Sequence, residues 1–260
     1  MPIVAIAPAA HVPAGVTVAE PTTDAVVDAV RAAWAGGQQD LMLLTGDDES
    51  EKVARAVRLV LGATHLAVVP LTLPPTAFFV VATALQMLPP HAIGLAPALV
   101  EESAATIWTR ALLSSVSALD RPAPSLGQDL ASRMPGSTFL VDWTAQTVQR
   151  TSEELEVPAG AVAAVVSESE KPVARVDRGT WDTRDVVEIS TSGSFWGASR
   201  WFELSLVAAP PARLVSRVIE AARVGQAERC PACGRVVAGS ACVFCQVGLT
   251  PAPAVQPIPA

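Results

Sequence analysis

The chain has 260 residues, of which 50% are apolar and 17% are charged. This composition supplies enough apolar side chains for a buried core and excludes a mainly disordered protein. The net charge of −7 argues against a body built to neutralise phosphates.

Both ends of the chain point to a protein of the reducing cytoplasm. The amino terminus has no basic region before its short apolar run, which Pro8 and Pro13 soon interrupt. Residues 2–7 are therefore predicted to form a first strand rather than a secretory signal. All four cysteines fall within sixteen residues near the carboxyl end, whereas a secreted disulfide scaffold normally spreads them along the chain.

The first 120 residues alternate short apolar runs with helical patterns. Strands are predicted over 2–7, 40–44, 65–71 and 92–95, and helices over 22–34, 50–61, 76–88 and 101–119. Alternating strands and helices predict an α/β domain over 1–120, with a parallel, doubly wound sheet covered by helices on both faces. Continuously apolar strands agree with burial on both faces.

One segment raises the question of a membrane. Leu59 to Val100 contains no charged residue, but it contains six prolines. Its longest proline-free helical piece, 76–88, is shorter than the roughly 20 residues that a spanning helix needs. We therefore expect core elements here and consider a membrane partner the weaker alternative.

The character of the chain changes after a proline-rich break over 120–137. Strands are predicted over 138–148, 161–167, 173–176, 186–190 and 201–207, so 137–209 is expected to be mainly β. This region either extends the first sheet or forms a separate lobe. Its aromatic loop, with Phe195 and Trp196, is either an exposed binding anchor or part of the core.

An amphipathic helix is predicted over 211–228, followed by a cysteine segment over 229–248 and a flexible proline-rich tail over 249–260. The four cysteines form two C-x-x-C pairs, Cys230/Cys233 and Cys242/Cys245, separated by eight residues. Four thiolates at this spacing favour one tetrahedral Zn²⁺. Two disulfides or four free thiols are the alternatives.

The sequence Cys230-Pro231-Ala232-Cys233-Gly234 with a second C-x-x-C pair resembles the short zinc-ribbon tails of many bacterial proteins. The spacer is shorter than in the commoner pattern, and Gln246 stands where such tails often carry glycine. Four cysteine ligands close the coordination sphere, so this zinc is expected to be structural. The ribbon is expected to fold as a separate, metal-dependent module.

A weaker candidate site lies where the predicted parallel strands end. His11 follows the first strand, and Asp47, Asp48 and Glu49 follow the second. Ligands of such sheets collect at this edge, so these residues form a candidate ligand-binding set. The three acids have an alternative role as complements to a helix dipole. No glycine-rich phosphate loop and no nucleophile elbow is present.

These features lead us to predict a non-enzymatic adaptor, scaffold or regulatory subunit. The ribbon and the amphipathic helix would contact a protein partner or a second copy of the chain. The first alternative is an enzyme or small-ligand sensor that uses the strand-end residues. The second alternative is nucleic-acid contact, because the segment from residue 212 onward carries +3 while the remainder carries −10.

Overall fold

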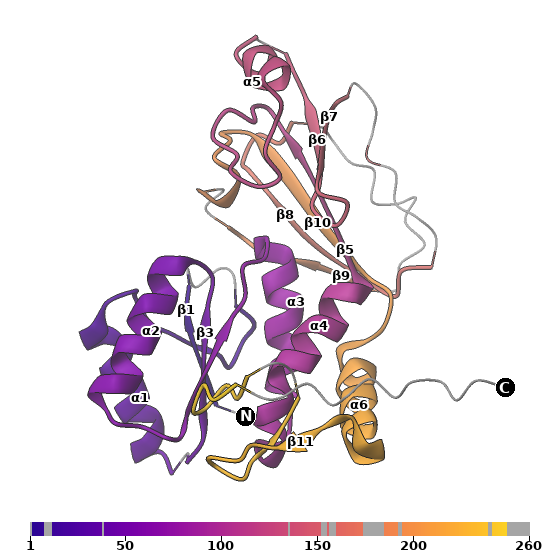
Figure 1. The fold of residues 1–260 in the computed structure, drawn as a ribbon. Coiled ribbons are helices and arrows are strands. Elements are labelled where there is room, and N and C mark those ends of the chain that lie inside the picture. The colour runs from indigo at the N-terminus through magenta and orange to yellow at the C-terminus, as the bar shows by residue number, and fades with distance from the viewer. Residues whose placement is uncertain are drawn as a thin grey trace, which may run out of the picture.

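The computed structural model describes residues 2–7, 12–37, 39–134, 136–151, 155, 160–173, 185–191, 194–238 and 241–248. Two sheets form two lobes, with the second lobe extending away from the first (Figure 1). The predicted α/β class with a mainly β second half is confirmed. His11 and most of the predicted strand 173–176 lie outside the described residues.

The first lobe is built on a four-stranded parallel sheet in the order β2-β1-β3-β4. The strands are β1 (Ile3–Ile6), β2 (Thr17–Val18), β3 (Leu41–Thr45) and β4 (Leu66–Pro70). Helices α1 (Thr23–Ala35) and α2 (Asp48–Val60) accompany one face, where residues such as Val26 and Val57 pack. Continuous burial of β1 and β3 matches their continuous apolar sequence.

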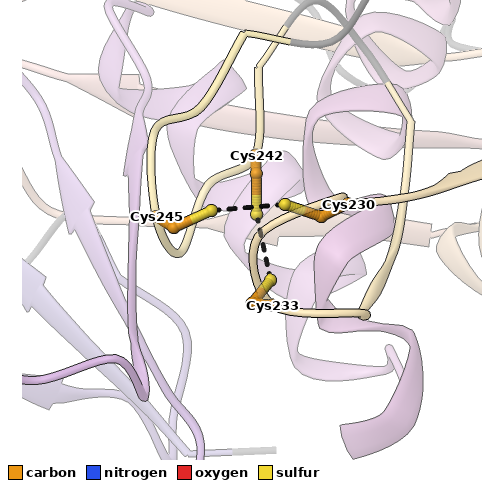
Figure 2. A group of neighbouring side chains, drawn as sticks. All are labelled: Cys230, Cys233, Cys242 and Cys245. Carbon is orange, nitrogen blue, oxygen red and sulfur yellow. Dashed lines mark hydrogen bonds between the residues drawn. The ribbon is translucent and has the colours of Figure 1, made fainter.

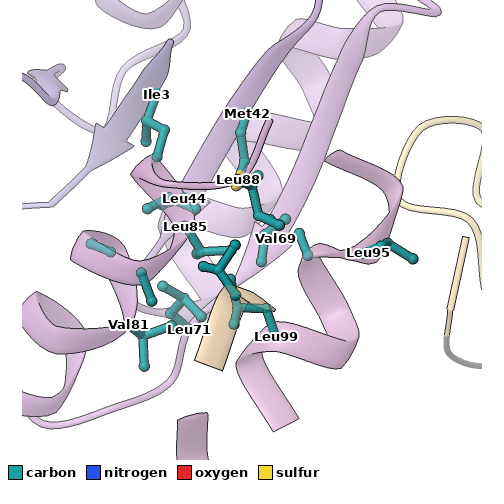
Figure 3. Packing of buried hydrophobic residues seen from close by; sticks show 14 of the residues in the cluster. Ile3, Met42, Leu44, Val69, Leu71, Val81, Leu85, Leu88, Leu95 and Leu99 are labelled. Carbon is teal, nitrogen blue, oxygen red and sulfur yellow. The ribbon is translucent and has the colours of Figure 1, made fainter. Parts of the chain in front are cut away.

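The core on the other face of this sheet includes α3 (Pro75–Gln86) and the 3₁₀ segment η2 (Pro90–Leu95). Helices α4 (Ala96–Thr106) and α6 (Pro211–Ala221) complete this core by packing against α3 and against each other. Figure 3 shows this core, with Met42 and Leu44 of β3 packed near Leu85 and Leu88 of the α3 region. Helix α3 is buried on nearly all sides because it also contacts the second sheet.

The second lobe is a six-stranded sheet in the order β7-β6-β5-β10-β8-β9, with neighbours antiparallel except for the parallel pair β8–β9. The strands are β5 (Ile107–Leu113), β6 (Phe139–Asp142), β7 (Thr147–Arg150), β8 (Ala163–Glu168), β9 (Asp185–Glu188) and β10 (Trp201–Val207). A short helix, α5 (Leu126–Ser132), lies at the far tip of this lobe (Figure 1).

Three predicted elements are wrong. The single strand predicted over 138–148 is a hairpin of β6 and β7, joined by a turn over 143–146. The helix predicted over 101–119 ends at Thr106, and β5 follows and pairs with β10 along seven residues. Burial alternates over the first part of β5, where Ile107, Thr109 and Ala111 are buried, which is the period of a strand, and the last two residues of β5 are buried as well. The second sheet therefore begins before the predicted boundary at residue 120. The strand predicted over 92–95 is instead part of η2, where the chain turns after two prolines.

None of the helices in the described part of the chain is both long enough and apolar enough to cross a bilayer. The uncharged stretch between Leu59 and Val100 forms the end of α2, then β4, α3, η2 and part of α4. Its apolar side chains are mostly core residues of the first lobe.

After α6 come a π-helical turn, η5 (Ala222–Gln226), and a small ribbon with strands β11 (Glu228–Arg229) and β12 (Val236–Val237). The ribbon packs into the main core rather than standing apart, since Cys230, Cys242 and Phe244 are buried within it. Gly94 of η2 allows this close packing, because a Cβ there would lie 2.0 Å from the carbonyl oxygen of Val236.

The ribbon also covers the open edge of the first sheet. The backbone N–H of Val68 in edge strand β4 donates to the carbonyl of Val243, at 3.2 Å. Arg235 donates to Asp40 at 2.8 Å and stacks over the ring of Phe244 at 4.2 Å. An otherwise exposed strand edge is thereby partly paired within the same chain.

Candidate functional site

The ribbon brings the four cysteines together through two matching turns. In the first turn the N–H of Gly234 donates to Cys230 O, and in the second the N–H of Gln246 donates to Cys242 O, both at 2.8 Å. Gly234 has φ of 71° and Gln246 has φ of 57°, so both turns end in a left-handed residue. Glutamine thus occupies the position that glycine fills in the first turn.

The four Sγ atoms converge on one point between these turns, and all lie within 4.8 Å of one another. Figure 2 shows Cys230 facing Cys245, with Sγ atoms 3.3 Å apart, and Cys233 facing Cys242, at 3.7 Å. All four are free cysteines. The predicted cluster is confirmed as a group that could hold a metal ion.

Backbone donors surround the sulfur atoms. The N–H groups of Cys233 and Ala232 hydrogen-bond to Cys230, and those of Cys245 and Phe244 hydrogen-bond to Cys242. Burial acts to raise the pKa of the Cys230 thiol, but the backbone donors and the neighbouring Cys245 and Cys233 thiols outweigh it and lower the pKa to about 6. At Cys242 burial outweighs the backbone donors and raises the pKa to about 12. Donors aimed at sulfur stabilise thiolates, which are the form that binds metal.

A second candidate site is a cavity of about 700 Å³ between the lobes, which we call the interlobe cavity. The first lobe contributes the residues that follow β1, β3 and β4, and the second contributes loop residues after β5 and β6 and before β10. Its apolar wall consists of Ile6, Ala7, Leu73, Pro75, Phe78, Leu119, Trp143 and Phe195. Its charged residues are Asp47, Asp48, Glu49, Asp120 and Arg121.

The three acids of the predicted ligand-binding set all line this cavity. Asp47 also caps α2, because its Oδ1 accepts from the N–H of Ser50 at 2.7 Å. The Ser50 Oγ in turn accepts from the N–H of Asp47 at 3.2 Å, which completes a capping box. Asp48 and Glu49 lie in the first turn of the same helix. The positions of all three acids at the start of α2 therefore agree with the alternative role, in which they complement the helix dipole.

The two aromatic residues of the loop in the β half lie in different surroundings. Trp196 is completely buried, whereas Phe195 is half-buried and lines the interlobe cavity beside Trp143. The ring centroids of Trp143 and Phe195 are 5.6 Å apart. No sequence pattern marks Trp143 as a site residue, because it lines the cavity only where the turn between β6 and β7 meets the other lobe.

Sequence reasoning also missed a buried carboxylate where the lobes meet. Glu203 on β10 is 0% exposed, and its Oε1 accepts from the N–H and hydroxyl of Thr76 at 2.7 and 2.6 Å. Its Oε2 accepts from Trp196 Nε1 at 2.7 Å. Burial raises the pKa of Glu203, and the hydrogen bonds from Thr76 and Trp196 offset part of that effect.

This carboxylate ties together two parts of the cavity wall. Thr76 lies in the first turn of α3, next to Pro75, and Trp196 is next to Phe195. Helix α3 has no side-chain cap of its own, so Glu203 satisfies a helix N–H from the other lobe. No short motif marks this contact, because Thr76 and Glu203 are 127 residues apart.

No family model matches the chain, and no curated protein matches it. Among solved structures, a DegV family protein from Thermus thermophilus, described as fatty-acid binding, aligns with a TM-score of 0.54 and 7% identity over 80% of this chain and 99% of that protein. A DegV family protein from Eubacterium eligens, loaded with heptadecanoic acid, aligns with a TM-score of 0.50 and 14% identity over 72% and 78%. Identities this low show a shared fold alone.

These findings contradict the predicted adaptor, scaffold or regulatory function. Of the two proteins with a similar fold, one is described as fatty-acid binding and the other as loaded with heptadecanoic acid. The amphipathic helix expected to contact a partner is α6, and its apolar residues Leu214, Val215 and Val218 are buried in the chain's own core. The argument for a partner surface there therefore fails.

Proposed function

We propose that this chain binds one amphipathic, lipid-like molecule, with its aliphatic chain in the interlobe cavity. The observation that carries the proposal is the cavity itself, whose apolar wall comes from both lobes. Its volume of about 700 Å³ lies within the range of small-molecule sites, which are concave and mainly apolar with a few polar groups. Its position, at the carboxyl ends of parallel strands, is where α/β sheets collect ligands.

A smaller cavity of about 190 Å³ offers room for the end of such a chain. It shares the lining residues Leu73 and Trp143 with the interlobe cavity, and its other lining residues include Ala77 of α3 and Ile107 of β5. An aliphatic tail that passes between Leu73 and Trp143 would reach this second space. The binding of fatty acids by the two proteins of similar fold supports a ligand of this class.

Displacement of a fluorescent long-chain alcohol tests this proposal, with Leu73→Gln as the test variant. Leu73 is half-buried and lines both cavities. Burial of one leucine side chain is worth about 1.5–3 kcal/mol, so binding is expected to weaken at least about tenfold. The matched control is Leu126→Gln on α5, where the leucine is 85% exposed. Absence of saturable binding, or equal loss in both variants, would contradict the proposal.

We also propose that the four cysteines hold one structural Zn²⁺. Tetrahedral coordination with Zn–S bonds of about 2.3 Å requires sulfur atoms about 3.8 Å apart, close to the 3.3 and 3.7 Å of the two facing pairs. Four thiolates leave no open position for catalysis. The ion would hold both ribbon turns against β4.

Metal analysis of protein purified without chelator tests the zinc proposal. One zinc per chain is expected, and Cys233→Ser is expected to lose it. A metal-free protein whose intact mass shows two disulfides would contradict the assignment.

A further inference from the structure

We infer that the interlobe cavity prefers amphiphiles with a cationic headgroup, such as an alkyl amine or a quaternary ammonium, over free carboxylic acids. The inference rests on the proposed function and goes beyond it, because the fold alone would suggest a fatty acid. Its evidence is the set of charged and aromatic residues that line the cavity, together with the carboxylates that already accept hydrogen bonds from helix N–H groups beside it.

The helix N-termini at this cavity are occupied by the protein's own carboxylates. Such N-termini are the usual anion sites at this edge of a sheet, because their first N–H groups lack partners within the helix. Asp47 accepts the N–H of Ser50 at the start of α2. Glu203 accepts the N–H of Thr76 at the start of α3. A ligand carboxylate at either helix start would therefore lie beside a protein carboxylate that already accepts one of its N–H groups.

Arg121 is the single basic side chain among the described residues that line the cavity. Its Nε donates to Gln146 Oε1 at 3.1 Å, and its guanidinium lies 6.0 Å from the centre of the Trp143 ring. The same lining contains four carboxylates, on Asp47, Asp48, Glu49 and Asp120. The field in the cavity consequently favours a positive headgroup and opposes a negative one.

The aromatic residues supply a second element of cation recognition. Trp143 and Phe195 both line the cavity and are half-buried, so part of each residue remains accessible. Aromatic faces attract amines and quaternary ammonium groups through their quadrupole, and tryptophan does so most strongly. Aliphatic, aromatic and acidic walls together fit a cationic amphiphile better than a fatty acid.

The test uses three ligands with the same dodecyl chain: dodecyltrimethylammonium, dodecanol and laurate, each below its micellar concentration. Each competes with the fluorescent alcohol at neutral pH. We expect the ammonium to bind about tenfold more tightly than laurate at low salt, with dodecanol between them. The difference in affinity between the ammonium and laurate should shrink at about 0.5 M salt, because the charged side chains of the cavity are exposed and salt screens them.

The double variant Glu49→Gln with Asp120→Asn should narrow the difference in affinity between the ammonium and laurate, mainly by weakening ammonium binding. The matched control is Asp129→Asn on α5, which lies outside the cavity lining. Laurate binding as tight as ammonium binding, and lost in Arg121→Gln, would overturn the headgroup inference while the proposed function stands. Failure of all three ligands to bind would overturn the proposed function and this inference with it.

Discussion

Replacing Glu203 with glutamine tests how the two lobes are joined. The glutamine carbonyl can still accept from the N–H and hydroxyl of Thr76. Its amide N–H₂ then faces Trp196 Nε1–H, which is also a donor, so one buried donor loses its acceptor. An unsatisfied buried donor costs about 1–3 kcal/mol, which is the expected loss of unfolding free energy when Glu203 is protonated.

The size of this loss should depend on pH in a defined direction. Burial raises the pKa of Glu203 above its ordinary value of 4.5. Between 4.5 and the folded-state pKa, the unfolded chain ionises at Glu203 while the native chain keeps the proton. The wild-type protein therefore loses stability as pH rises through this window, and the glutamine variant does not lose it. The stability gap between the two proteins should narrow with rising pH.

Urea unfolding at several pH values, from about 4.5 into the neutral range, measures this gap. The matched control is Asp185→Asn on the exposed strand β9 of the same sheet, which should stay within about 0.5 kcal/mol of the wild type throughout. A gap for Glu203→Gln that is constant, or that widens as pH rises, would refute the reasoning.

Two further predictions concern the ribbon. Gly234→Ala should lower the unfolding free energy by about 1–2 kcal/mol because the position is left-handed, whereas Gln246→Gly should be neutral or slightly stabilising, as thermal unfolding would show. Chelation should speed hydrogen exchange at the Val68 amide of β4, because its acceptor Val243 belongs to the ribbon. Exchange changes confined to residues after 228 would instead support the separately folding module expected from the sequence.

Local patterns in the sequence were sufficient for much of the first lobe. The predicted strands 40–44 and 65–71 coincide closely with β3 and β4, because uninterrupted apolar runs of this length are typical of strands buried on both faces. The cysteine cluster was also predictable, since both pairs lie within sixteen residues and each pair is held by one turn. The helix predicted over 101–119 failed because Ile107, Trp108 and Leu112 fit a helical stripe as well as a strand.

The α/β class, the main helices and strands of the first lobe, and the thiol cluster thus follow from local patterns along the chain. The pairing of β5 with β10, the docking of the ribbon on β4, and the interlobe cavity arise only when distant segments meet in the folded chain. The reason is physical: periodicity along a chain reports which side chains are buried, but not which distant segment buries them. The bond between Thr76 and Glu203 spans 127 residues, and the cavity wall draws on loops from both lobes.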